Sequence, residues 1–405
     1  NNSAWSALAG AAVAHGLDAG VAAIGAFDDG GGTGLVVGGG FTSASGSEVN
    51  HVARWSGLSW TALSGPADVG TSAEVRAFAV FDDGSGPALF VGGDFTTAGG
   101  VVVNNVAKWD GSQFLALSGA SGTGVDGPVH ALSVHDDGDG VALFVGGDFS
   151  SAGSWTANNI AKWDGLEWSA LVGPAGNGTS RAVAALEVYD DGSGDALYAG
   201  GSFVTAGGVL VNRVARWNGE QWMPLLGPFD IGMSGEVNAL EVWNDGASEA
   251  LFAGGDFIYA GGVATHNVAR WDGSQWSWLY SPYGIGVDAE VFALEAADDG
   301  RGEALFVGGD FWVAGDTPAN RVARWDGMEW STLLGARGIG TDARVNTLKG
   351  FIDNGAPAIF VGGIFEIAGG VVSHSIARWS CVSPPLVFAD GFEWSDLRMW
   401  SDWNE

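Results

Sequence analysis

Cysteine is almost absent from this chain, and long apolar runs are missing altogether. The 405 residues include one cysteine, Cys381, and no Cys/His spacing of the zinc-binding kind. One cysteine cannot form a disulfide within the chain, so the fold must be held together by packing and hydrogen bonds. No run of 18 apolar residues occurs, which excludes a membrane-spanning helix.

Basic residues are also scarce. Lys and Arg together number 16 against 47 Asp and Glu, which gives a formal net charge of −31. A charge of this sign and size repels phosphate backbones and anionic lipids. We therefore expect neither a nucleic-acid partner nor membrane insertion.

Glycine is present in excess, with 69 residues, while 46% of the chain is hydrophobic. That apolar fraction can build a core, so the glycine does not indicate a disordered chain. No Gly-X-Y period indicates collagen. A length above 300 residues predicts two or more domains unless an internal repeat accounts for it.

An internal repeat does account for it. Two motifs, apolar-Gly-Gly-X-Phe and Ala-(Arg/Lys)-Trp, each recur seven times at a spacing of 54 residues. The first motif ends at Phe41, Phe95, Phe149, Phe203, Phe257, Phe311 and Phe365, and the second at Trp55, Trp109, Trp163, Trp217, Trp271, Trp325 and Trp379.

Each repeat reads as four short antiparallel strands. In the third copy the apolar runs 129–134, 142–149, 159–164 and 167–171 are separated by turn clusters. Asp164-Gly165 is a favoured hairpin turn because both central residues of such a turn need positive φ. The Gly pair in the second run predicts close approach of another backbone. Four strands per repeat, with no helical period, predict an all-β fold built of propeller blades.

The two chain ends predict how the ring closes. The seventh copy stops at Cys381 without its fourth strand, whereas residues 4–8 match the fourth strand of the other copies. An N-terminal strand that completes blade seven would seal the ring. We therefore predict a seven-bladed β-propeller over residues 1–381, with a C-terminal tail over residues 382–405.

One basic position recurs in all seven repeats, at Arg54, Lys108, Lys162, Arg216, Arg270, Arg324 and Arg378. The Asp that follows Gly-Gly recurs in four copies, at Asp94, Asp148, Asp256 and Asp310. Alternation along neighbouring strands favours an ion pair between these two positions within each blade. A ring of basic residues with a binding role is the alternative.

The positions that break the repeat are the candidates for function. One position of the first strand, which lines the channel in propellers, reads Gly25, Ala79, Ser133, Glu187, Glu241, Glu295 and Lys349. The three successive Glu predict an acidic arc with oxygen ligands suited to calcium, or a solvated channel wall. A second position reads Ala22, Arg76, His130, Ala184, Asn238, Phe292 and Asn346. A lyase or hydrolase in the channel would use the three Glu together with His130 and Arg76, although no nucleophile, base and orienting group stand in register.

Four tryptophans that break the repeat, Trp155, Trp243, Trp278 and Trp312, are candidates for surface stacking on sugar rings. Packing of loops between blades is the alternative.

The repeat resembles a known type of sequence. Residues 91–114, VGGDFTTAGGVVVNNVAKWDGSQF, are similar to the glycine-rich, kelch-like repeats of secreted bacterial proteins and fungal cortical polarity-marker proteins. The tail, with Phe388-Ala-Asp-Gly-Phe-Glu393 followed by Trp400, resembles the "DGFE…W" endings of secreted bacterial proteins. The resemblance implies the propeller fold and an extracellular, bacterial protein. A chain that begins directly at a strand would fit removal of a secretion signal.

The tail predicts self-association. Its aromatic residues are Phe388, Phe392, Trp394, Trp400 and Trp403. Such a segment must dock, on its own ring or on the free strand edge of a neighbouring copy. Docking on neighbours head to tail would build a filament. We therefore expect a non-enzymatic extracellular assembly protein without cofactor. A propeller that binds carbohydrate or protein is the alternative, and a channel enzyme is a third.

Overall fold

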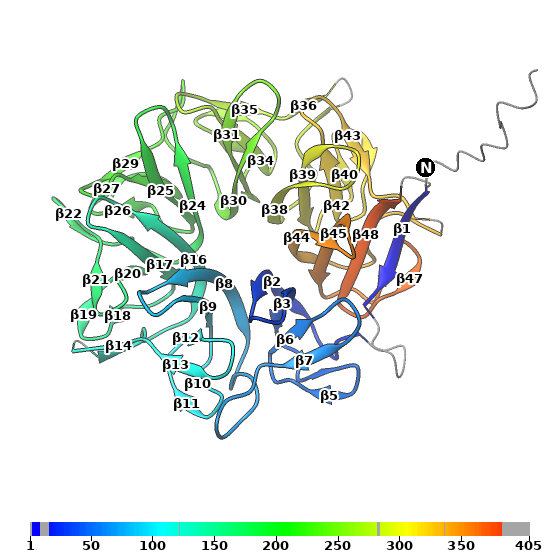
Figure 1. Ribbon diagram of the computed structural model, residues 1–405. Coiled ribbons are helices and arrows are strands. Elements are labelled where there is room, and N and C mark those ends of the chain that lie inside the picture. The colour runs from blue at the N-terminus through cyan, green and yellow to red at the C-terminus, as the bar shows by residue number, and fades with distance from the viewer. Residues whose placement is uncertain (1, 9–15, 121, 282–283, 336, 383–405) are drawn as a thin grey trace, which may run out of the picture.

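Seven four-stranded antiparallel sheets form a ring (Figure 1). A computed structural model describes residues 2–8, 16–120, 122–281, 284–335 and 337–382. All regular secondary structure within these ranges is β, so the predicted all-β, seven-bladed propeller is confirmed. No helix in the described ranges is long and apolar enough to cross a membrane.

The first strand of each blade lies innermost and the fourth lies outermost. The inner strands are β2 (Val21–Asp28), β8 (Val75–Asp82), β16 (Val129–Asp136), β24 (Val183–Asp190), β30 (Glu236–Asn244), β38 (Val291–Asp298) and β44 (Val345–Asp353). The second strands are β3 (Thr33–Gly39), β9 (Pro87–Gly93), β17 (Val141–Gly147), β25 (Asp195–Gly201), β31 (Glu249–Asp256), β39 (Glu303–Gly309) and β45 (Ala356–Gly363).

The third strands are β6 (Val52–Trp55), β12 (Val106–Trp109), β20 (Ile160–Trp163), β28 (Val214–Trp217), β34 (Val268–Trp271), β42 (Val322–Trp325) and β48 (Ile376–Val382). The outer strands are β7 (Trp60–Ala62), β13 (Phe114–Ala116), β21 (Trp168–Ala170), β29 (Trp222–Pro224), β35 (Trp276–Trp278), β43 (Trp330–Thr332) and β1 (Asn2–Ala7).

The ring closes as the sequence predicts. The N-terminal strand β1 pairs with β48 in the sheet β1-β48-β45-β44, so the two ends of the described chain complete blade seven together (Figure 1). The observed strand covers residues 2–7 in place of the expected 4–8, and Trp5 pairs with Trp379.

Short two-stranded hairpins, which the sequence did not predict, lie in the connections between strands and between blades. Seven of them connect the second and third strands: β4 (Ser43–Ala44) with β5 (Ser47–Glu48), β10 (Thr97–Ala98) with β11 (Val101–Val102), β18 (Ser151–Ala152) with β19 (Trp155–Thr156), β26 (Thr205–Ala206) with β27 (Val209–Leu210), β32 (Tyr259–Ala260) with β33 (Val263–Ala264), β40 (Val313–Ala314) with β41 (Thr317–Pro318), and β46 (Ile367–Ala368) with β47 (Val371–Val372).

Three more hairpins lie in connections between blades: β14 (Ser118–Gly119) with β15 (Gly122–Thr123), β22 (Val172–Gly173) with β23 (Gly176–Asn177), and β36 (Tyr280–Ser281) with β37 (Gly284–Ile285).

The hydrophobic core lies between the blades. Each buried apolar cluster draws on two neighbouring blades, for example Phe90 of blade two with Val129 and Leu143 of blade three. The first glycine of the Gly-Gly pair makes this contact possible. A Cβ on Gly92 would lie 2.5 Å from Val129 Cγ1, so the next inner strand fits only against glycine. The predicted close approach of another backbone is confirmed at the second glycine, because a Cβ on Gly93 would collide with the carbonyl oxygen of Glu74.

The repeated basic residues form ion pairs within each blade, but the predicted partner is wrong. Each pairs with the aspartate of the turn between the first and second strands, at N–O distances from 2.6 to 3.4 Å. The seven pairs are Arg54–Asp29, Lys108–Asp83, Lys162–Asp137, Arg216–Asp191, Arg270–Asp245, Arg324–Asp299 and Arg378–Asp353.

Strand register explains the difference. Lys108 lies opposite Phe90, and its ammonium reaches the turn at one end of the strand, whereas Asp94 follows the other end. Asp94 binds Arg76 and Asp310 binds Arg321. Asp148 and Asp256, the two other aspartates predicted to pair with the basic ring, are likewise not its partners, because the turn aspartates take that place.

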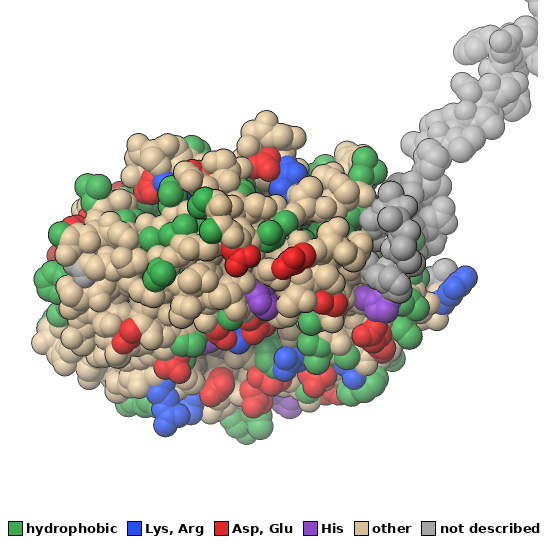
Figure 2. Space-filling view, turned by 90° about the horizontal axis from the view of Figure 1, so that it is seen from below, with side chains coloured by type: hydrophobic (Ala, Val, Ile, Leu, Met, Phe, Trp, Pro, Cys, Tyr) green, Lys and Arg blue, Asp and Glu red, His purple; other side chains and the backbone are tan. Residues whose placement is uncertain are grey.

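Acidic side chains lie along the lower part of the molecule in the edge-on view of Figure 2, with basic side chains scattered among them.

Candidate binding site at the channel mouth

A β-bulge near the start of every inner strand places one residue at the mouth of the central channel. The register between first and second strands shifts there in all seven blades, for example between Val75 and Ala77. The extra residue is left unpaired, and bulges of this kind redirect a side chain. The seven bulged residues are Ala22, Arg76, His130, Ala184, Asn238, Phe292 and Asn346. They are the second position at which the sequence breaks its repeat.

The second glycine of the Gly-Gly pair permits the bulge. A Cβ on Gly93 would collide with the carbonyl oxygen of Glu74, which the bulge brings over the second strand. The same collision occurs at Gly147 with Pro128 and at Gly201 with Ala182. The repeated second glycine therefore leaves room for the bulge that carries the variable residue of each blade to the mouth.

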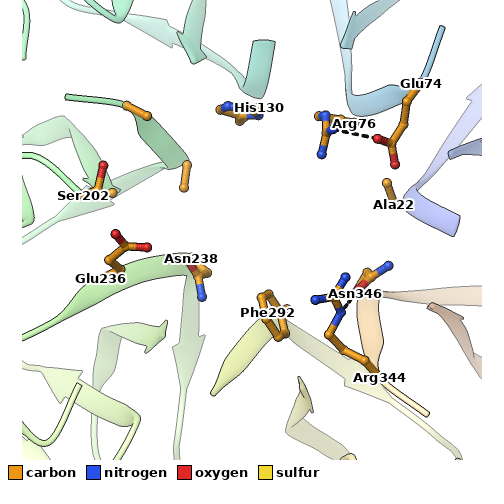
Figure 3. A pocket seen from close by; sticks show the side chains of 13 residues that line it. Ala22, Glu74, Arg76, His130, Ser202, Glu236, Asn238, Phe292, Arg344 and Asn346 are labelled. Atoms are coloured by element: carbon orange, nitrogen blue, oxygen red, sulfur yellow. Dashed lines mark hydrogen bonds and ion pairs between the residues drawn. The ribbon is translucent and has the colours of Figure 1, made fainter. Parts of the chain in front are cut away.

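A cavity of about 380 Å³ occupies the mouth (Figure 3). All seven bulged residues line it, together with Glu74, Ala182, Gly201, Ser202, Glu236 and Arg344. Ala22 of blade one and Ala184 of blade four leave the space open, because their side chains are the smallest of the seven bulged residues. The wall combines guanidinium, imidazole, amide and carboxylate groups with one aromatic ring.

Arg76 is held by two carboxylates. Its Nε and Nη2 donate to the two oxygens of Asp94, each at 2.9 Å, and Nη2 also lies 2.7 Å from Glu74. The hydrogen bond to Asp94 raises the pKa of Arg76 above its ordinary value. The guanidinium group of Arg76 is thus fixed in position. Its third nitrogen, Nη1, forms no hydrogen bond or ion pair with the described residues.

Arg344 is oriented by neutral groups. Its Nε donates to Asn346 Oδ1 at 2.8 Å, and its guanidinium carbon lies 4.7 Å from the centre of the Phe292 ring. Asn346 in turn donates to the carbonyl of Val21 at 2.8 Å, which ties blade seven to blade one. Within the described ranges, no carboxylate forms an ion pair with Arg344.

His130 and Asn238 complete the wall. Burial lowers the pKa of His130, and the adjacent positive charge of Arg76 lowers it further, so the imidazole is neutral at pH 7. Asn238 donates to the carbonyl of Val291 and to Glu290, both at 3.0 Å. Asn238 and Asn346 therefore make the same bond to the following blade.

The predicted acidic arc lies deeper in the channel and includes a cation of its own. Lys349 Nζ lies 2.7 Å from Glu295 Oε1. Glu241 accepts a hydrogen bond from Ala296 N at 3.1 Å, and Glu295 accepts one from Gly350 N at 2.9 Å. No group of three or more metal-ligating side chains in the described part of the chain is placed to hold a metal ion.

Burial governs how these glutamates titrate. It raises the pKa of Glu187 to about 7, with a further contribution from the charge of Glu295. It also raises the pKa of Glu241 well above the ordinary value, reinforced by the charges of Glu295 and Glu187. Burial alone would lower the pKa of Lys349, but the three carboxylates, Glu295 foremost, raise it overall.

Three of the four candidate tryptophans are at the surface. Trp155, Trp278 and Trp312 are exposed, and the guanidinium of Arg321 lies 4.0 Å from the ring centre of Trp312. The prediction that Trp243 is a surface residue is wrong, because it is only 5% exposed and packs on Phe252. The equivalent residues in other blades are the buried Phe27, Phe81, His135 and Tyr189 and the partly buried Ala297 and Phe351.

Sequence reasoning missed Glu74, Glu236 and Arg344 as lining residues. They occupy one repeat position, two residues before the bulge, which reads Gly20, Glu74, Pro128, Ala182, Glu236, Glu290 and Arg344. Variation at this position was a signal that could have identified them. The predicted tail residues Phe388, Phe392, Trp394, Trp400 and Trp403 lie outside the described residues.

Comparison with known proteins identifies the fold. No family model and no curated protein matches the sequence. The extracellular domain of BT4673 from B. thetaiotaomicron, named as a one-component system, matches with a TM-score of 0.53 and 12% identity over 93% of this chain, which spans 40% of that chain. BBS1N, solved in complex with ARL6, matches with a TM-score of 0.49 and 12% identity over 95% of this chain and 99% of that one. At such low identity, the likeness to the BT4673 domain shows a shared fold alone.

Proposed function

We propose that this protein is a non-enzymatic, extracellular binding propeller that holds its ligand at the channel mouth. The proposal rests on one observation: the side chains at the mouth differ from blade to blade. The repeat keeps its glycines, tryptophans and ion pairs in all seven blades, whereas the seven bulged residues range from alanine to arginine. A purely structural ring would not require these differences at a single mouth.

The chemistry of the mouth suits binding better than catalysis. Polar side chains converge on an open cavity, and its Arg76 is already paired with Asp94. A cavity with a few placed polar groups and an aromatic wall is typical of a small-molecule site. The resemblance of the repeats to those of secreted bacterial proteins supports an extracellular location.

The test is a binding screen of the full chain against immobilised oligosaccharides and short peptides. We expect hits that are lost in Ala184→Phe, which fills the cavity. Phe292 occupies the equivalent bulge in blade six, so the substituted blade should still fold. The control is Trp312→Ala, which removes an exposed ring outside the cavity. Binding that survives Ala184→Phe but not Trp312→Ala would move the site to the surface tryptophans.

A second function, self-assembly through residues 382–405, is favoured by a separate observation. Among the described strands, the outer strand of each four-stranded sheet pairs on one side alone, and an extended aromatic segment can add to its other edge as a further strand. Electron microscopy of the full chain and of a chain ending at residue 381 tests this proposal. Filaments formed equally by both would overturn it.

A further inference from the structure

We propose that the channel mouth binds a carboxylate group of its ligand between Arg344 and Arg76, with the adjoining carbon skeleton against Phe292. This inference rests on the proposed function and names the chemistry of the ligand. The two arginines come from blades seven and two, on either side of blade one. Among the described residues that line the cavity, blade one contributes only Ala22, so the space in front of both guanidinium groups is open (Figure 3).

Both guanidinium groups have nitrogen atoms available to a ligand. Asp94 and Glu74 occupy Nε and Nη2 of Arg76, which leaves Nη1 for a ligand. Asn346 occupies Nε of Arg344, and the described residues offer its two terminal nitrogens no ion-pair partner. A planar guanidinium fork matches the two oxygens of a carboxylate, which makes these hydrogen bonds directional and strong.

The surrounding charges favour a singly charged ligand. Glu74, Asp94, Glu236 and Glu290 lie at or beside the mouth, the last interacting electrostatically with Arg344, so a phosphate dianion would meet more repulsion than a carboxylate. The neutral imidazole of His130 adds a hydrogen-bonding group without adding charge. The ring of Phe292 gives an apolar surface for carbon atoms next to the carboxylate.

Two kinds of ligand carry such a carboxylate: an acidic sugar and a peptide with a free C-terminus. We would therefore measure the affinity of the full chain for two matched pairs of probes by calorimetry. One pair is a disaccharide ending in glucuronic acid and the same disaccharide ending in glucose. The other pair is an acetylated tripeptide with a free C-terminus and its C-terminal amide.

We expect one acid probe to bind and its neutral partner to bind at least tenfold more weakly. Arg344→Ala should reduce binding of the acid about tenfold or more and should weaken the neutral probe by a smaller factor. Alanine is tolerated at this position, since Ala182 occupies it in blade four. Arg344→Lys should restore part of the loss, because it keeps the charge but not the fork.

The outcomes separate this inference from the proposed function. Equal binding of acid and neutral probes that Ala184→Phe abolishes would overturn the carboxylate site and leave the mouth as the binding site. Binding of an acid probe that neither Ala184→Phe nor Arg344→Ala weakens would overturn both. If neither acid probe binds while the screen gives neutral ligands at the mouth, the carboxylate inference is again wrong.

Discussion

Lys349 Nζ lies 2.7 Å from Glu295 Oε1, so one ion pair joins the inner strands of blades six and seven inside the channel. The neighbouring blades five and four contribute Glu241 and Glu187 to the same layer. The ammonium of Lys349 therefore interacts electrostatically with three carboxylates, those of Glu295, Glu241 and Glu187. Burial raises the pKa of all three glutamates, and the stability of the ring should depend on pH for that reason.

Glu187→Gln should remove part of this pH dependence. The folded pKa of Glu187 is about 7, above its ordinary value of 4.5. Its contribution to stability is thus complete below pH 4.5 and is lost as the pH rises through 7. The amide stays neutral throughout, so the variant should match the wild type near pH 4.5 and exceed it at pH 8 by up to roughly 3 kcal/mol. Urea unfolding at both pH values measures the difference, and an equal shift at both would contradict this origin.

His135→Phe should stabilise the protein in acid. Burial lowers the pKa of His135, which is 7% exposed and packs on Phe144. A lowered histidine pKa means that the unfolded chain gains the proton first, so stability falls as the pH drops below about 6.5. Phenylalanine occupies the equivalent position at Phe27 and Phe81, so the core accepts it. We expect a gain of about 1 kcal/mol at pH 5 and a smaller one at pH 8, measured by thermal unfolding. A larger gain at pH 8 would contradict the titration of His135 as the cause.

Gly92→Ala should destabilise blade two against blade three. The added Cβ would lie 2.5 Å from Val129 Cγ1, and the buried inner strand cannot move away freely. Overpacking of this kind costs about 1–3 kcal/mol. The matched control is Gly40→Ala, since a Cβ on Gly40 meets nothing within 4 Å. Chemical denaturation of both variants gives the comparison, and equal midpoints would show that the close approach carries no energetic weight.

Lys108→Met should cost about 3 kcal/mol. Lys108 and Asp83 have side chains that are 8% and 12% exposed, so removing the ammonium leaves a poorly hydrated carboxylate. Lys108→Met combined with Asp83→Asn should recover part of the loss. Asp139→Ala serves as the exposed control, because Asp139 is 81% exposed in its pair with Lys162 and should cost less than about 1 kcal/mol. A similar cost for the buried and the exposed pair, measured by urea denaturation, would refute the role of burial.

Much of the architecture was predictable because its signals are local and repeated. The hairpin at Asp164-Gly165, the Gly pair at Gly146 and Gly147, and the Trp163–Trp168 contact recur in equivalent form around the ring. The expected turn type is wrong, because the loop spans residues 164–167 and only Gly165 in it has a positive φ, while Asp164 accepts hydrogen bonds from the backbone of Leu166 and Glu167. The absence of a fourth strand after Trp379 and its presence around Trp5 predicted the closure that β1 and β48 make.

The partners of the basic ring were not predictable from strand alternation. Alternation shows which side chains share a face, but not which end of a strand a long side chain reaches. Lys108 could face Asp94 or Asp83 on that criterion, and only the three-dimensional course of the turn brings Asp83 to 2.6 Å. Likewise, Trp243 differs from the residues at the same repeat position, which suggested a surface role. The structure shows that it is buried in the core against Phe252.

The sequence by itself determined the number of blades, the order of their strands and the way the ring closes. Each of these follows from a period of 54 residues and from turn chemistry that acts over a few neighbouring positions. Only the tertiary structure decided that Arg76, His130, Asn238 and Arg344 line one cavity. These residues lie in four different repeats. Their meeting depends on the bulges that carry Arg76, His130 and Asn238, on the place of Arg344 two residues before the bulge of its blade, and on the closed ring that turns them toward one axis.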